Sequence, residues 1–274
     1  MEKAFGIREV CELTFRAKIA HKIGSKMYEV DEPVIRFDTA KTSGLEGAAT
    51  TVYAQGGRGN PRLIAWQGEK TLTLTFEEAL ANADSLQILM GATISDATQY
   101  NHHFRTRVVA AGTDKLDVTD YLNDSIFGGE SASNTLIIDE DYPIYIYKDS
   151  DGTSIEDATK GSAAGEITCT VEKGEVYIVD GYFTTKGVTL SIDPDVFGQY
   201  YYIEAETLFR DEATGADKAS QIVIPKGQIQ NNFTMTMANN GDPSTFTFTV
   251  DCMPDYTKGN KTKKVLAELN MAGE

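Results

Sequence analysis

The sequence is poor in the residues that most often carry chemistry. Its 274 residues include three cysteines, three histidines and one tryptophan. Cys11, Cys169 and Cys252 are odd in number and far apart, which favours free thiols in a reducing compartment over a disulfide framework. No uncharged apolar run reaches the length of about 18 residues that a spanning helix needs, so we expect no membrane binding. Charges at Lys3 and Arg8 predict that the chain lacks a signal peptide.

Basic residues are also scarce. Lys and Arg number 25 against 41 Asp and Glu, giving a formal net charge of −16 and an isoelectric point near 4.6. Because affinity for nucleic acid comes largely from basic side chains that neutralise phosphates, a DNA-gripping surface is disfavoured. The acidity is concentrated in residues 71–257, which hold 10 basic and 30 acidic side chains. The mildly basic ends suit contacts with acidic surfaces of sister copies, and an acidic solubilising face with basic tails explains the same pattern.

No motif for catalysis or metal binding stands out. Residues 56–60 (Gly-Gly-Arg-Gly-Asn) lack the Gly-Lys-Ser/Thr ending of a phosphate-binding loop. Residues 149–152 (Asp-Ser-Asp-Gly) do not fit a calcium loop, because with Gly152 at its sixth position the first and twelfth positions would be Tyr147 and Ala158, which are not carboxylates. His102 and His103 are adjacent on an expected strand and therefore point to opposite faces. The sequence predicts no catalytic residue, no cofactor and no metal site, and thus a protein that is not an enzyme.

Apolar and polar residues alternate along most of the chain, which predicts a mainly β fold. The clearest pattern, residues 232–238 followed by 245–251, predicts a hairpin that turns at 239–244. One face of this hairpin is apolar, with Phe233, Met235, Met237, Phe246, Phe248 and Val250, and the other carries Thr234, Thr236, Thr245, Thr247 and Thr249. A neutral, β-branched threonine face suits a wall past which something slides. An ordinary solvent-facing side of a sandwich explains the pattern equally well.

Two further hairpins and one helix are expected. Residues 200–209 pair with 219–225 in one hairpin, and residues 166–172 pair with 175–179 in the other. Thr75 and Glu78 fit a capping box that starts a helix. Leu80, Ala83, Leu86, Leu89 and Met90 then share one face, and Gly91 ends the helix. The acid-rich and Gly/Ser-rich segments of residues 112–187 indicate a β-rich insertion.

Several segments resemble tail tube proteins of contractile-tailed bacteriophages. They are residues 53–66 (YAQGGRGNPRLIAW), 72–80 (LTLTFEEAL), 206–210 (ETLFR), 224–226 (IPK) and 241–248 (GDPSTFTF). The similarity covers the chain except much of its middle. It implies a tail-tube-type β-barrel or rolled β-sandwich with one flanking α-helix, built from residues 1–111 and 188–274. The β-rich insertion, residues 112–187, then lies on the outside.

The resemblance also implies a function. Members of such a family form hexameric rings that stack into the inner tail tube, with long hairpins of adjacent subunits joined edge to edge. The tube is then a smooth, negatively charged conduit for genome delivery inside a contractile sheath. Its partners are further copies of the chain, the tail sheath protein, the tape measure protein and, transiently, genomic DNA in the lumen. The protein is expected in the tail of the virion, after assembly in the bacterial host cytoplasm.

On this interpretation, particular residues receive roles. Thr234, Thr236, Thr245, Thr247 and Thr249 are candidates for the lumen, Phe233, Met235, Phe246 and Phe248 for packing within the subunit, and Gly56, Gly57, Arg58, Gly59 and Asn60 for contacts between rings. Three alternatives stay open. They are another virion part with the same barrel, such as a baseplate or decoration protein; the tube of a particle that delivers no genome; and a carbohydrate-binding β-sandwich.

Overall fold

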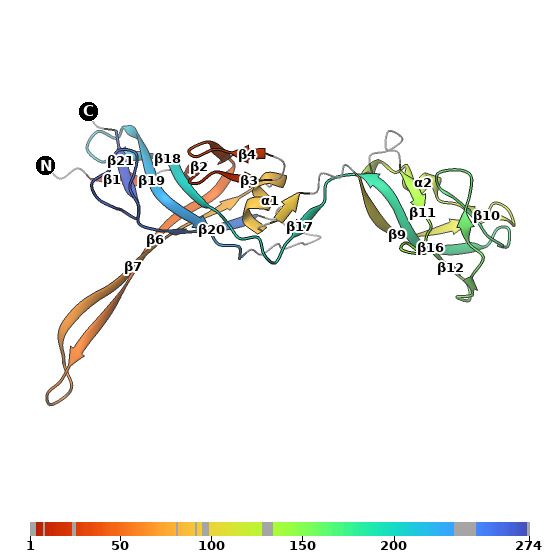
Figure 1. Ribbon diagram of the computed structural model, residues 1–274, viewed down its shortest axis with the longest axis horizontal. Helices are drawn as coiled ribbons and strands as arrows, with labels where there is room; N and C mark the ends of the chain where they lie inside the picture. Colours follow the sequence, from red (N-terminus) through yellow and green to blue (C-terminus); the bar gives the residue numbers. More distant parts are fainter. Residues whose placement is uncertain are drawn as a thin grey trace. The chain divides into compact units, whose positions relative to one another are not determined.

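The computed structural model describes residues 4–7, 9–23, 26–80, 82–90, 92–94, 99–127, 134–232 and 245–272. The chain divides into two compact units, the first formed by Met1–Ile94 with Leu190–Glu274 and the second by Ser95–Thr189 (Figure 1). Antiparallel sheets make up both units, which confirms the mainly β fold. The second unit begins at Ser95 and not at residue 112, because the strand before residue 112 pairs inside it.

The first unit is built on one nine-stranded antiparallel sheet. In sheet order, its strands are β5 (Pro33–Phe37), β2 (Glu12–Ala17), β18 (Tyr200–Asp211), β19 (Asp217–Ile229), β20 (Phe246–Cys252), β7 (Arg62–Glu78) and β6 (Ala40–Gln55), with β1 (Phe5–Ile7) beside β18 and β21 (Glu268–Met271) beside β19. Two small ribbons accompany the sheet, β3 (His21–Ile23) with β4 (Lys26–Tyr28) and β8 (Ala92–Ile94) with β17 (Leu190–Ile192). The β18–β19 pairing confirms the hairpin expected from residues 200–209 and 219–225.

The large sheet is rolled around its core. Phe37 lies on β5, at one end of the strand order, yet its ring centroid is 5.0 Å from that of Phe76 on β7, near the other end. Phe248 of β20 completes the cluster, 4.8 Å from Phe76 and 4.9 Å from Phe37, and is fully buried. Among the described strands, no hydrogen-bonded ladder joins β5 to β6. The roll is therefore an open one, with two terminal strands.

The helix differs from the expectation in where it starts. Thr75 and Glu78 belong to strand β7 and pair with β20, so the capping box expected there is wrong. Helix α1 spans Ala83–Met90. It begins with a different reciprocal cap, in which the Asn82 N–H donates to Ser85 Oγ (3.0 Å) and the Ser85 N–H donates to Asn82 Oδ1 (2.7 Å). Gly91, the expected end, lies outside the described residues.

The second unit has its own core and its own sheets. A five-stranded sheet contains β9 (Gln99–Val109), β16 (Val176–Lys186), β11 (Thr135–Ile137), β12 (Tyr145–Lys148) and β13 (Ser154–Ile155), and a three-stranded sheet contains β10 (Lys115–Asp117), β15 (Glu166–Thr168) and β14 (Thr159–Lys160). Helix α2 (Thr119–Leu122) and the 3₁₀ turn η1 (Ser125–Phe127) lie between β10 and β11. β16 pairs with β9 along its whole length, whereas β15 pairs with β10 and β14. The hairpin expected from residues 166–179 is therefore wrong.

Candidate functional site

The most distinctive element of the first unit is the β6–β7 hairpin. Its ladder runs from Ala40 opposite Glu78 to Gln55 opposite Arg62. β20 supports β7 only between Thr73 and Glu78, so the remainder, residues 47–72, is a two-stranded ribbon that we call the distal hairpin. It projects from the sheet in Figure 1. At about 3.3 Å per residue, the distal hairpin reaches roughly 35 Å beyond the last β20 pair.

The distal hairpin exposes apolar side chains along its outer half. They are Val52, Tyr53, Leu63, Ile64 and Trp66, which are 62%, 39%, 64%, 55% and 53% exposed. Val52 lies opposite Trp66 and Ala54 opposite Ile64, so these four share one face of the ribbon. An isolated two-stranded hairpin is marginally stable in water. Clustered apolar exposure of this kind is typical of a surface that another molecule covers.

The tip of the hairpin is a tight turn whose sequence meets its backbone requirements. The Asn60 N–H donates to the Gly57 carbonyl (3.1 Å) and the Gly56 N–H donates to the Pro61 carbonyl (3.3 Å). Gly57 and Gly59 have φ of 84° and 89°, in the left-handed region that glycine adopts without steric cost. The five residues proposed for contacts between rings, 56–60, therefore form the end of the ribbon.

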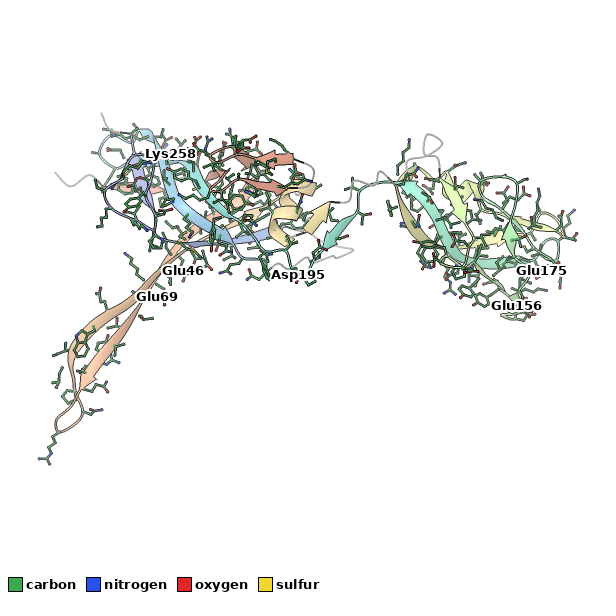
Figure 2. All side chains as sticks on the ribbon, viewed as in Figure 1. Glu46, Glu69, Glu156, Glu175, Asp195 and Lys258 are labelled. Carbon is green, nitrogen blue, oxygen red and sulfur yellow. The ribbon has the colours of Figure 1, made fainter. Side chains whose placement is uncertain are left out.

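A bulge with a specific glycine shapes the distal hairpin near its base. The ladder shifts register between Ala49 and Thr51, where the Glu69 N–H donates to Thr50 Oγ1 (2.9 Å). A Cβ atom at Gly68 would lie 2.5 Å from this hydroxyl oxygen, which is too close. Glu46 and Glu69 mark this basal region in Figure 2. Gly68 is thus required by packing, because its own φ is not in the left-handed region.

The described part of the threonine face continues onto a neighbouring strand. Thr249 lies opposite Thr75 and Thr247 opposite Glu77, while Asp251 lies opposite Thr73. These side chains alternate with the buried Leu74, Phe76, Phe248 and Val250, so they form a polar face on the side away from the core. The sequence interpretation missed the β7 contribution because it assigned Thr75 to a helix cap. We call Thr73, Thr75, Glu77, Thr247, Thr249 and Asp251 the polar face.

Some of the other residues of the expected hairpin lie in or against the core, and others are outside the described residues. Phe248 is fully buried in the core and Phe246 is partly buried against it. Thr245 immediately precedes β20 and is partly buried. The expected lumen residues Thr234 and Thr236 and the expected packing residues Phe233 and Met235 lie outside the described residues.

The described residues form no arrangement with an obvious reactive chemistry. Within them, no group of three His, Cys, Asp or Glu side chains is placed to hold a metal ion. His102 packs against Phe183 (5.3 Å between ring centroids), whereas His103 Nε2 lies 2.8 Å from an Asp180 carboxylate oxygen, so the two rings face opposite ways. Burial raises the pKa of Cys252 to about 11, which keeps this thiol protonated and unreactive. No described helix is long and apolar enough to cross a bilayer.

A rolled sheet that extends a free apolar ribbon is typical of structural proteins that build assemblies. The model of the YomU/Tube protein family matches residues 25–266, and the chain belongs to this family. It is therefore a phage structural tube protein, a component of the virion tail and not an enzyme. The match spans both units, including the whole of Ser95–Thr189. A comparison with curated proteins found no match.

Proposed function

We propose that this chain is the inner tube subunit of a contractile phage tail. Six copies form a ring, rings stack into a hollow tube inside the sheath, and the tube conducts the genome. Its partners are further copies, the tail sheath protein, the tape measure protein and DNA in transit. The family match supports a tube protein. The hexameric ring, the surrounding sheath and the DNA cargo are our proposal.

The distal hairpin is the observation that carries this proposal. It has two free edges beyond β20 and an exposed apolar face, and neither is satisfied within the described part of the chain. Unpaired strand edges recruit further strands, and a head-to-tail interface that closes on itself makes a ring. Edge pairing of the hairpin with the next subunit would complete its hydrogen bonds and cover its apolar side chains.

The two ends of the rolled sheet suit such a ring. β5 and β6 are its terminal strands, and among the described strands each has a neighbour on one side only. Pairing β6 of one copy with β5 of the next would continue the sheet from subunit to subunit, and closure would leave no edges. Residues 56–60, at the end of the ribbon, would then reach an adjacent ring.

We assign the polar face to the lumen. Threonine keeps strand propensity while offering no basic group to phosphates, which suits a wall that cargo slides past. Six copies at −16 each would carry about −96 per ring, a charge whose summed field repels DNA. The second unit holds seven basic and seventeen acidic residues, so −10 of each −16 belongs to Ser95–Thr189. The polar face itself contributes two carboxylates, Glu77 and Asp251.

Electron microscopy with sedimentation tests the proposal. We expect the purified chain to form stacked rings with an open bore, and a protein that stays monomeric at all concentrations would refute it. Replacing Val52, Ile64 and Trp66 with serine should abolish the rings. A matched variant, Leu80→Ser with Phe197→Ser, removes apolar side chains that are 71% and 69% exposed outside the hairpin and should assemble normally.

Virions separate the remaining alternatives. Antibodies raised against the chain should label the whole length of the tube after sheath contraction, whereas a baseplate component would label one end and a decoration protein the outer surface of intact particles. DNA recovered inside partly ejected tubes would distinguish a genome conduit from a particle without a genome. Clear glycan-array binding by a chain that forms no rings would favour the carbohydrate-binding sandwich.

A further inference from the structure

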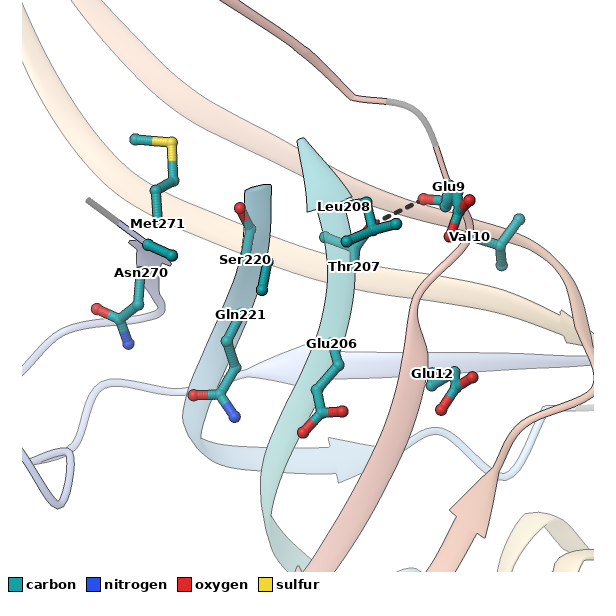
Figure 3. A pocket seen from close by; sticks show the side chains of 12 residues that line it. Glu9, Val10, Glu12, Glu206, Thr207, Leu208, Ser220, Gln221, Asn270 and Met271 are labelled. Carbon is teal, nitrogen blue, oxygen red and sulfur yellow. Dashed lines mark hydrogen bonds between the residues drawn. The ribbon is translucent and has the colours of Figure 1, made fainter. Parts of the chain in front are cut away.

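A groove of about 640 Å³ opens on the first unit's sheet, on the side away from the core. The strand register places Glu12 of β2 opposite Glu206 of β18, Glu206 opposite Gln221 of β19, and Gln221 opposite Asn270 of β21. Four polar residues thus form one row across four strands, about 14 Å long at the usual strand spacing. In Figure 3 the side chains of Glu206, Gln221 and Asn270 point to the same side of the sheet.

The row holds negative charge that is not fully neutralised. Like charges directly opposite each other on neighbouring strands destabilise a sheet, and Glu12 and Glu206 are such a pair. Arg36 of β5 forms an ion pair with Glu12. The same Arg36 guanidinium also interacts electrostatically with Glu206, whose side chain has no ion pair or hydrogen bond within the described residues. A third carboxylate, that of Glu9, lies at the rim. The groove therefore favours a cationic occupant.

Apolar side chains form the other wall of the groove. Val10, which is 38% exposed, lies there, together with Leu208 and Ala219, which are opposite each other on β18 and β19. A well-matched occupant combines one positive charge with apolar neighbours. A volume of this size is in the range of about 300–1,000 Å³ that accommodates a ligand of several side chains.

We propose that the groove receives the tip of the β6–β7 hairpin of a second copy, with Arg58 of that copy against Glu206. This inference rests on the proposed tube function. Arg58 is exposed and has no ion pair among the described residues. The other arginine near the tip, Arg62, already makes a cation–π contact, with its guanidinium 4.2 Å from the centre of the Tyr53 ring. Leu63, which is 64% exposed on β7 next to the tip, matches the apolar wall. The chain's own tip projects away from its sheet, so the occupant comes from another copy (Figure 1).

Charge exchange tests this contact. Arg58→Glu alone and Glu206→Arg alone should each raise the concentration needed for ring stacking by about tenfold, because each places like charges face to face. The double variant should return to within about threefold of the wild type, as a restored pair predicts. Lys261→Glu and Glu212→Arg, at exposed positions outside both surfaces, are the matched controls and should stack normally. Thermal melts of all variants verify that they fold.

A cross-link identifies the partner surface directly. Arg58→Cys combined with Gln221→Cys should form disulfide-linked chains of several copies in assembled tubes, and Arg58→Cys with Lys261→Cys should not. Assembled tubes of the Arg58→Cys, Gln221→Cys variant that form no disulfide between copies, or a double charge variant no better than the worse single one, would overturn the groove assignment and leave the tube function standing. A wild-type chain that never assembles would overturn both.

Discussion

Trp66 offers the sharpest test of the hairpin as an assembly element. It is the chain's only tryptophan and is 53% exposed on the distal hairpin. A tryptophan buries up to about 250 Å² when fully covered, so covering its exposed part would remove about 130 Å² from water. At about 25 cal/mol per Å², this burial contributes about 3 kcal/mol per contact. Trp66→Ala should therefore raise the concentration for assembly by up to about a hundredfold.

Two measurements follow this change. Sedimentation gives the assembly concentration of each variant, and the fluorescence of the single tryptophan reports the surroundings of the hairpin in the wild type. We expect the emission to shift to the blue as the protein concentration rises. Phe197→Ala, a change at another exposed aromatic side chain, is the control. Trp66→Ala tubes that form at the wild-type concentration, or a tryptophan that stays water-exposed in assembled tubes, would refute the reasoning.

Three further predictions concern the subunit itself. Phe248 packs between two phenylalanine rings at 4.8 and 4.9 Å, so Phe248→Ala should lower the free energy of unfolding by about 3–5 kcal/mol in urea titrations; an unchanged midpoint would contradict the core assignment. The Lys218 ammonium, followed by the N–H groups of Thr214 and Ala213, lowers the pKa of Asp211 to about 2. A carboxylate with a lowered pKa stabilises the fold at pH values above its unfolded pKa of about 3.9, and this contribution is lost as the pH falls towards 2. Asp211→Asn should therefore make the melting temperature depend less on pH between about 4 and 2. A variant whose melting temperature falls with pH as steeply as that of the wild type would show that other groups cause the dependence. Burial raises the pKa of both Cys169 and Cys252 to about 11, so neither should react with iodoacetamide at pH 8 until the protein is denatured, and mass spectrometry of the native protein would reveal any exception.

The sequence predicts the β18–β19 hairpin, whose signals are local and regular. The β18–β19 pair has clear alternation and a turn rich in Asp, Thr and Gly, and both strands lie where the pattern places them. β6 gives no such signal, because Gly, Ala and Thr dominate its sixteen residues and almost none of its side chains is buried. β6 is recognised as a strand by its ladder with β7. That pairing depends on residues of both strands, so the pattern within β6 alone does not predict it.

The helix error has a different physical cause. Thr75 and Glu78 satisfy the local rule for a capping box, but their backbone groups are used in ladders with β20 and β6. Tertiary pairing therefore overrides a local preference worth about 1 kcal/mol. The true cap, Asn82 with Ser85, uses the same chemistry seven residues later. The same error concealed Thr75 and Glu77 as members of the polar face.

The composition of β6 also bears on how the exposed apolar ribbon of the proposed tube subunit is protected against aggregation. Long, flat, hydrophobic edges aggregate, and proteins limit this with charges, bulges and weak strand formers. The distal hairpin has all three: Glu69 and Lys70 near its base, register shifts at Ala49 and near Gln55, and a first strand that begins with the weak strand formers of residues 47–49 (Gly-Ala-Ala). Its exposed large apolar side chains lie in the outer half. We infer that the base resists indiscriminate pairing, so that a partner must match the outer half and the tip together, and this favours a specific neighbour over aggregation.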